Sequence, residues 1–302
     1  MKILCAVDES EFSLWALESL GQLFRHSIKE LVLLHVLDTR ILSGGGKRRP
    51  KDQETSTKDL TRTLEARGKK ILTDCAHRME VVLSQATTKP FAALKTAMVK
   101  GHVADAILSN AEKSRPDLVV VGSRGMNDLP GYLLGSISRT VLTHGPCSVL
   151  MVKQPPPDVP VSVLLALDGS KPSKFAASRV KEWLSPEDVT LQLVSVVPEI
   201  LTDVSTMLTK TRLKTLVAPL RQHAQECLDQ YRELFLKEGF QVSGKRLQGN
   251  PREQIVESVP ACHAQLVVMG SKGLTGLDRF SMGSVSEWVS AYAPASVLVV
   301  RH

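Results

Sequence analysis

Residues 116–125 read PDLVVVGSRG, and residues 264–273 read AQLVVMGSKG. Each stretch is a short apolar run that stops at a glycine, with a second glycine three positions later. An uninterrupted apolar run between turn residues is typical of a strand that is buried on both faces. Such strands belong to parallel sheets covered by helices on both sides, so these two stretches predict an α/β fold.

The sequence around these stretches also forms an internal repeat of two copies. ILCAVDESEFS (3–13) corresponds to LLALDGSKPS (164–173), and GSISRTVLTHGPCSVLMV (135–152) corresponds to GSVSEWVSAYAPASVLVV (283–300). Corresponding residues are 160 positions apart near the start of each copy and 148 apart further on, so the first copy carries twelve additional residues. We expect these residues in the polar, glycine-rich loop 42–56, between the second and third strands.

The repeat predicts two tandem domains, 1–153 and 161–302, joined by the proline-rich segment KQPPPDVP (153–160). Apolar runs alternate with stretches of helical periodicity in each copy. Each domain is therefore predicted to be a doubly wound, Rossmann-like α/β domain with a five-stranded parallel sheet. In the first copy the expected strands are 2–7, 30–37, 93–99, 117–122 and 147–152, and the expected helices are 11–25, 57–85, 102–113 and 135–144.

Composition narrows the functional classes. The net charge is +7, but aromatic residues make up only 4% of the chain, too few for a platform that stacks single-stranded nucleic acid. A surface for anionic small molecules, or a plain solvated surface, is favoured over a nucleic-acid site. No apolar run approaches the ~20 residues of a membrane span and no signal sequence is recognised, so a cytoplasmic protein is expected. Cysteines and histidines are scattered, so we predict no metal site and no catalytic residue.

The glycines form one spacing, G-x2-G-x9-G-S, in both copies, at 122–136 and at 270–284. The first two glycines follow the fourth strand, where a parallel sheet binds its ligands, and the third opens the next helix. Glycine turns and free amides at a helix start both suit phosphate oxygens. A Walker loop and a dinucleotide fingerprint need other spacings, which are absent. The spacers MNDLPGYLL (126–134) and LTGLDRFSM (274–282) are long enough to fold over a ligand.

This motif, its place after the fourth strand and the closing (A/G)-P-x-S-V-L strands resemble the universal stress protein family in its tandem form. The resemblance covers nearly the whole chain and points to the ATP-binding branch, which implies an adenine nucleotide, often with Mg²⁺ or Mn²⁺. It implies phosphate contacts from the glycines and the helix start, a ribose contact from the aspartate after strand one, and an adenine contact from the backbone at the end of strand two. The implied residues are Asp8, Val36, Gly101, Gly122, Arg124, Gly125, Gly135, Ser136 and Ile137 in the first copy, and Asp168, Val196, Gly249, Gly270, Lys272, Gly273, Gly283, Ser284 and Val285 in the second.

Several of these residues have a structural alternative. Asp8 and Asp168 either contact the ribose or cap the next helix, and the two roles can coexist. Arg124 and Lys272 either pair with phosphate or are solvated loop residues. The glycines after strand three either approach the base or form plain turns. Loop 42–56 is either disordered or a lid over the nucleotide.

Three functions follow from this sequence. The first is an ATP-binding protein of stress response or signalling, in which the nucleotide alters loops that partners contact. The second is a slow ATPase or an autophosphorylating enzyme, which the sequence supports weakly because it lacks an arranged nucleophile and base. The third is a scaffold that dimerises, since the last strands, 148–152 and 296–300, would be sheet edges. The two domains are then expected to form an internal pseudo-dimer, and two chains a homodimer.

Overall fold

The structure is a computed structural model that describes residues 1–40, 52–86, 93–125, 134–155, 160–199, 210–273 and 282–302. The chain divides into two compact units, Met1–Pro155 and Pro156–His302, which we call the first and second domains. The elements of the first domain are β1 (Lys2–Ala6), α1 (Glu11–Leu23), β2 (Glu30–Asp38), α3 (Asp52–Ala86), β3 (Ala93–Gly101), α4 (Val103–Ser114), β4 (Leu118–Gly122), α5 (Ser136–His144) and β5 (Ser148–Val152).

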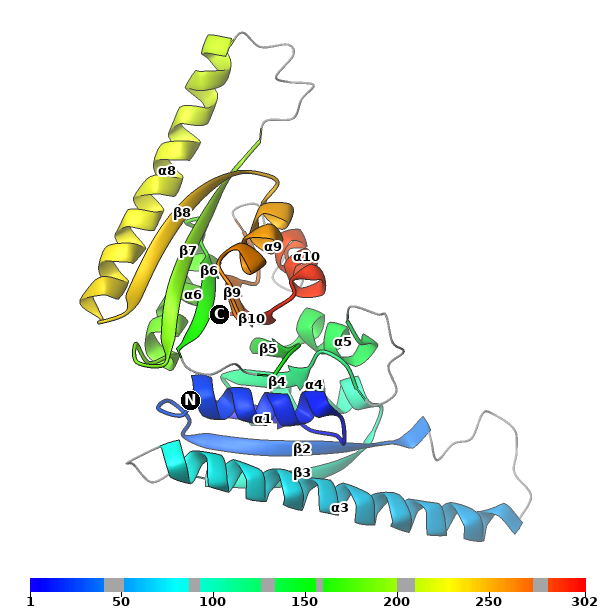
Figure 1. Ribbon diagram of the computed structural model, residues 1–302. Helices are drawn as coiled ribbons and strands as arrows, with labels where there is room; N and C mark the ends of the chain where they lie inside the picture. The colour runs from blue at the N-terminus through cyan, green and yellow to red at the C-terminus, as the bar shows by residue number, and fades with distance from the viewer. Residues whose placement is uncertain (41–51, 87–92, 126–133, 156–159, 200–209, 274–281) are drawn as a thin grey trace. The chain divides into compact units, whose positions relative to one another are not determined.

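The second domain repeats this order of elements (Figure 1). They are β6 (Val161–Ala166), α6 (Lys171–Trp183), β7 (Val189–Pro198), α8 (Lys210–Lys237), β8 (Gln241–Gly249), α9 (Pro251–Ala261), β9 (Leu266–Gly270), α10 (Ser284–Tyr292) and β10 (Ser296–Val300).

The strands of each domain are parallel and share one order. That order is β3-β2-β1-β4-β5 in the first domain and β8-β7-β6-β9-β10 in the second. β1 pairs with β2 on one side (Ala6 beside Leu34) and with β4 on the other (Cys5 beside Val120). The chain therefore reverses direction at β1, and the switch point of each sheet lies between its first and fourth strands. The predicted fold class, two tandem doubly wound parallel domains, is confirmed.

The helices cover both faces of each sheet. α1 and α3 pack against one face of the first sheet, and α4 and α5 against the other (Figure 1). Right-handed crossovers explain this division, because connections that run in opposite directions along a sheet place their helices on opposite faces. Strands β4, β5, β9 and β10 are buried nearly throughout, whereas the outer strands β3 and β8 carry polar and exposed residues.

The long helices correct the expectation for loop 42–56. α3 begins at Asp52, so residues 52–56 are helical, and residues 41–51 lie outside the described part of the chain. α3 has 35 residues and α8 has 28, so seven of the twelve additional residues lengthen a helix instead of a loop. The expectation failed because the polar and charged run DQETS (52–56) is typical of a loop, although such residues are tolerated in the first turns of a helix.

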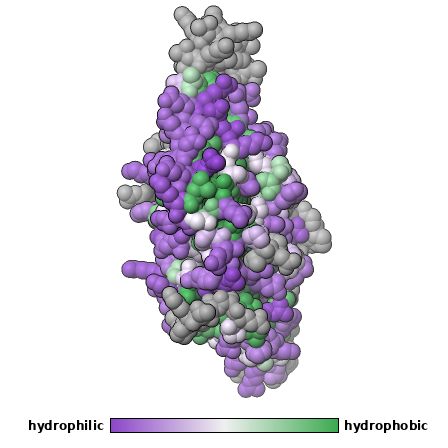
Figure 2. All heavy atoms as spheres, turned by 60° about the vertical axis from the view of Figure 1, so that its left-hand side comes forward, coloured by the Kyte–Doolittle hydropathy of each residue, from purple (hydrophilic) through white to green (hydrophobic). Residues whose placement is uncertain are grey.

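No helix in the described ranges is both long and apolar enough to cross a membrane. Most of the described residues visible on the face drawn in Figure 2 are hydrophilic, in keeping with apolar side chains that lie mainly in the two cores.

Candidate functional site

The aspartate after the first strand lies at the switch point and holds a turn with part of its carboxylate. In the first domain, Asp8 Oδ1 accepts hydrogen bonds from the Ser10 backbone N–H (3.0 Å), the Ser10 hydroxyl and the Ser13 hydroxyl (2.7 Å). In the second, Asp168 Oδ1 accepts from the Ser170 N–H at 3.0 Å. The helix caps themselves are Ser10 and Ser170, so the aspartates shape the turn before the helix and do not cap it.

The other oxygen of Asp168 faces the glycine loop. A Cβ placed on Gly273 would lie 2.9 Å from Asp168 Oδ2, so the carboxylate and the loop backbone are in close contact. One oxygen therefore orders the β6–α6 turn while the second is directed at the edge of the sheet where a ligand would bind. The structural and functional interpretations of this aspartate are compatible.

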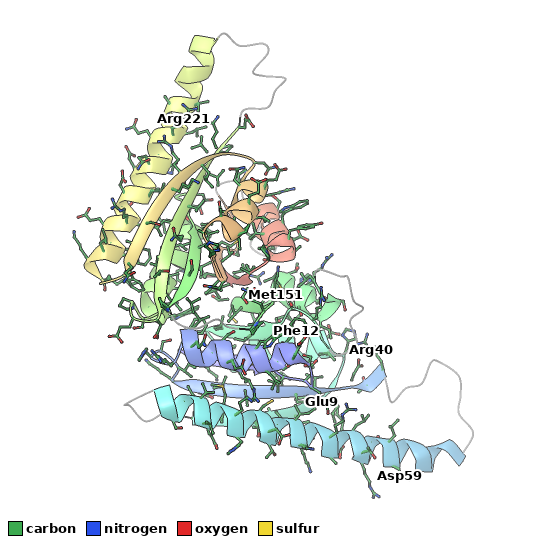
Figure 3. The ribbon with its side chains drawn as sticks, in the orientation of Figure 1. Glu9, Phe12, Arg40, Asp59, Met151 and Arg221 are labelled. Atoms are coloured by element: carbon green, nitrogen blue, oxygen red, sulfur yellow. The ribbon has the colours of Figure 1, made fainter. Side chains whose placement is uncertain are left out.

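The first glycine of each motif ends the fourth strand and makes room for a helix. A Cβ on Gly122 would lie 2.6 Å from Phe12 Cβ, and a Cβ on Gly270 would lie 2.7 Å from the carbonyl carbon of Pro172. Phe12 and Pro172 occupy the first turns of α1 and α6 (Figure 3 labels Phe12). We expected these glycines to open the backbone to a ligand, but their immediate role is to let the first helix approach the strand end.

The third glycine joins the two ends of the long spacer. We call the hydrogen-bonded pair at this point, Ser123 and Gly135 or Ser271 and Gly283, the neck of the spacer. The Gly135 N–H donates to the Ser123 carbonyl oxygen, and the Gly283 N–H donates to the Ser271 carbonyl oxygen, both at 2.8 Å. The residues on either side of the spacer are thereby joined, which brings the strand-end loop and the helix start together. The predicted fold of the spacer over a ligand concerns residues 126–133 and 274–281, which lie outside the described residues.

The helix that follows presents free donors at this neck. Gly135 and Gly283 cap α5 and α10, and the first intrahelical bonds are those from Arg139 N–H to Gly135 (3.0 Å) and from Glu287 N–H to Gly283 (2.9 Å). The amides of the three preceding residues point out of the helix start, as expected of any helix N-terminus. In the first domain they belong to Ser136, Ile137 and Ser138, and in the second to Ser284, Val285 and Ser286.

The peptide groups at the end of the second strand point toward the same carboxyl edge of the sheet. The Leu34 carbonyl oxygen accepts from the Val7 N–H at 2.9 Å, so the peptide groups of Leu34 point toward β1. Peptide groups of residues two apart point the same way in a strand, so those of Val36 point past the end of β1. Val196 has the same place, because the Leu167 N–H donates to the Val194 carbonyl oxygen at 2.8 Å.

The backbone at the end of the third strand adopts a conformation that favours glycine. Gly101 and Gly249 are the last residues of β3 and β8 and have φ of 156° and 139°. The second value lies in the region that L side chains rarely adopt, and the first is at its border. The turn interpretation is thereby supported, while the contact with a base stays a prediction.

The two basic residues of the glycine loops are partly exposed, at the same edge of their sheets. Arg124 and Lys272 follow the strand-end serine in each domain. Among the described residues, neither forms an ion pair with a carboxylate, so both charges are available to an anion at the edge. Gly125 lies beside Arg124 at the same edge and is partly buried.

The long helix contacts the aspartate turn differently in the two domains. Arg67 of α3 donates two hydrogen bonds to the Glu9 carboxylate, which lies at the start of α1 (Figure 3), and this pairing holds the pKa of Glu9 below its usual range. In the second domain the corresponding residue is Gly169 (φ 78°), and the His223 ring of α8 lies over it. Sequence comparison of the copies did not predict either contact.

Three pairs of serines complete the site, and the sequence interpretation missed them. Ser138 Oγ donates to the Gly122 carbonyl oxygen (2.6 Å), and Ser286 Oγ donates to the Ser271 carbonyl oxygen (2.8 Å). These bonds tie the helix start to the strand end. A usable signal was present, because D-x-S-x-x-S, G-S-[RK]-G and G-S-x-S occur in both copies. The pairs are Ser13 and Ser173, Ser123 and Ser271, and Ser138 and Ser286.

The described residues contain no group of three or more His, Cys, Asp or Glu side chains placed to hold a metal ion. A cation that accompanies a polyphosphate would have to take most of its ligands from the phosphate oxygens and water. Asp8 and Asp168 are the carboxylates at the switch point that could contribute one ligand each.

Comparisons with known proteins agree with this geometry. The model of the universal stress protein family matches residues 1–153 and 162–301. A protein named as a universal stress protein in Staphylococcus aureus (strain USA300) is 31% identical over 143 residues, which span 46% of this chain and 83% of that protein.

Solved structures show the same fold over both domains. A universal stress protein from Archaeoglobus fulgidus DSM 4304 has a TM-score of 0.67 at 21% identity, covering 100% of this chain and 96% of that one. A functionally unknown protein from Pseudomonas aeruginosa PAO1 has a TM-score of 0.61 at 18% identity, covering 99% and 92%. Because the family model matches both halves, the chain belongs to the universal stress protein family and carries two of its domains in tandem.

Proposed function

We propose that each domain binds an adenine nucleotide, ATP in the first instance, at the carboxyl edge of its sheet. The observation that carries this proposal is that the aspartate turn, the strand-end glycine loop and a helix start capped by glycine, with no side-chain cap, meet at the switch point of both domains. Donors from a helix start and a glycine loop suit phosphate, and a carboxylate oxygen directed at the edge suits ribose hydroxyls. The outward backbone of Val36 and of Val196 suits the hydrogen-bonding edge of adenine.

The nucleotide would act as a signal that partner proteins detect. Bound phosphate would order the residues on either side of Gly135 and Gly283, since those residues share the neck of the spacer. Mg²⁺ or Mn²⁺ would enter with the phosphates. A free ATP concentration of about 100 times the Kd would stabilise a domain by about 2.7 kcal/mol, which is readily detected as a thermal shift.

The decisive experiment replaces the exposed serine at each helix start by aspartate. Ser136→Asp and Ser284→Asp place a carboxylate where phosphate would bind, yet an acid in the first turn of a helix stabilises it by about 0.3–1 kcal/mol. We expect two ATP per chain in the wild type, one in either variant and none in the double variant, by isothermal titration calorimetry with Mg²⁺. Unfolding temperatures without ligand should be unchanged or higher.

Neutral replacements serve as matched controls. Ser136→Asn and Ser284→Asn have nearly the shape of the aspartate variants without their charge and should keep most of the binding. The proposal is wrong if millimolar ATP neither binds to nor stabilises the wild type, or if the double aspartate variant still binds two nucleotides. The same samples test the enzymatic alternative, because hydrolysis by these sites must disappear in the double variant.

A further inference from the structure

The two sites share their backbone geometry but carry different charges, and this difference predicts different ligands. Resting on the proposed nucleotide sites, we propose that the first domain selects polyphosphorylated adenine nucleotides, whereas the second selects a nucleotide whose phosphate charge is smaller and close to the ribose. The two sites would then respond to different members of one nucleotide pool.

The charge of one residue near the helix start is reversed between the two domains. Arg139 and Glu287 are equivalent, because each donates the first intrahelical hydrogen bond to the glycine cap of its helix, at 3.0 Å and 2.9 Å. Both side chains are exposed, and Cα–Cβ bonds in a helix tilt toward its N-terminus. The guanidinium of one and the carboxylate of the other therefore lean toward the end of the helix where phosphate would bind.

Neighbouring groups do not cancel this reversal. Within the described residues, neither Arg139 nor Glu287 takes part in an ion pair. Arg252 of α9 lies over the ring of Trp288, 5.8 Å from the ring centroid. The loop residues Arg124 and Lys272 have the same sign in both domains. The glycine loop and helix start of the first site thus carry Arg124 and Arg139, while those of the second carry Lys272 and Glu287, with Arg252 held at the Trp288 ring.

The two sites also carry different side chains beside the position where the ribose would bind. In the first domain the Glu9 carboxylate lies beside Asp8 and is balanced by Arg67. In the second domain Gly169 removes that carboxylate, and the His223 ring occupies the corner above it. A phosphate close to the ribose meets a carboxylate already paired with Arg67 in the first site and an imidazole in the second. Both ends of the two sites therefore favour the same division of ligands.

Each site is tested alone in the full chain. The Ser284→Asp protein isolates the first site and the Ser136→Asp protein isolates the second. Calorimetric titrations with ATP and with AMP then give a preference ratio for each site. We expect the ATP-to-AMP affinity ratio to be about five- to tenfold higher in the first site, a size consistent with screened charges about 8 Å apart.

Charge reversals show whether these side chains set the ratio. Arg139→Glu, made in the Ser284→Asp protein, should lower ATP affinity about fivefold and change AMP affinity less than twofold, because AMP lacks the distal phosphates. Glu287→Arg, made in the Ser136→Asp protein, should raise ATP affinity by a similar factor. Matched controls are Lys113→Glu in the last turn of α4 and Glu233→Arg in α8, which reverse exposed charges away from the glycine loops.

The outcomes separate this inference from the function on which it rests. Equal ATP-to-AMP ratios in the two sites, or ratios that the reversals at Arg139 and Glu287 leave unchanged, overturn the division of ligands while nucleotide binding stands. Failure of both nucleotides to bind the wild type overturns the proposed function itself. A shift that the control reversals reproduce shows a general charge effect, and it too overturns the assignment to these two side chains.

Discussion

At the scale of single residues, the aspartate after the first strand shows what a sequence pattern can and cannot determine. Its position at the switch point was predicted, because an apolar run that ends in D-x-S before an amphipathic stretch marks a strand, a turn and a helix. The use of each oxygen was not predictable. Asp8 Oδ1 takes hydrogen bonds from two serines, while Asp168 Oδ1 takes the Ser170 amide and its Oδ2 contacts the glycine loop. The contact of Asp168 Oδ2 depends on where the glycine loop packs, more than 100 residues away in sequence.

The strand-end glycines give the first prediction. Gly270→Ala should lower the free energy of unfolding by about 1–3 kcal/mol, because its Cβ would lie 2.7 Å and 2.9 Å from the carbonyl carbon and oxygen of Pro172, and backbone atoms yield little. Chemical denaturation followed by circular dichroism measures the change. Gly244→Ala is the matched control, since its Cβ would meet the nearest atoms at an ordinary 3.8 Å. Equal stability of the two variants would contradict the role given to Gly270.

At the scale of elements, strands were predicted better than helix boundaries. The central strand runs are apolar throughout, so burial marks them clearly, and the predicted 117–122 is observed as Leu118–Gly122. Helix α3 was predicted from residue 57 but starts at Asp52, because the polar run 52–56 has no apolar residue to mark a helical period. The sequence also did not predict which helices pack against each other, since periodicity indicates that a helix face is buried but not which element covers it.

The contact between α1 and α3 gives the second prediction. Gly21 lies in α1, where glycine is normally unfavourable by roughly 0.8–1 kcal/mol relative to alanine. A Cβ at this position would overlap Val82 Cγ1 of α3, so Gly21→Ala should destabilise the protein by about 1–3 kcal/mol in spite of its helix propensity. Adding Val82→Ala should restore part of the loss. Denaturation of both single variants and the double variant gives the coupling, and a double variant that is merely additive would contradict this packing.

The link between α3 and the aspartate turn gives the third prediction, which concerns pH. The hydrogen bonds from Arg67 hold the pKa of Glu9 below its usual range in the folded protein. Its stabilising contribution is therefore present above the unfolded pKa and is lost as pH falls through the folded pKa. The wild type should be slightly more stable than Glu9→Gln near neutral pH, and the difference should disappear in acid. Unfolding at a series of pH values tests this, with Glu112→Gln as the control that removes an exposed carboxylate on α4.

At the scale of the whole molecule, duplication would allow the two domains to bind different ligands, as proposed above. Each domain has its own core, its own switch point and its own glycine loop, so a change in one domain leaves the other complete. The copies keep the residues that form the turn and the neck, while Glu9, Arg67 and Arg139 have no counterpart of the same charge in the second domain. Shared geometry with different charge is expected where two sites keep one ligand scaffold and differ in selectivity.

The separate cores give the last prediction, which concerns how the domains open. Because Gly270 is packed against the start of α6, Gly270→Ala should increase amide exchange in β6, β7 and β9, the strands of the same core. Strands β1, β2 and β4 of the first domain should keep wild-type exchange rates, and Gly122→Ala should have the mirrored effect. Hydrogen–deuterium exchange with mass spectrometry resolves these segments in the intact chain. Faster exchange in both domains of either variant would contradict independent opening.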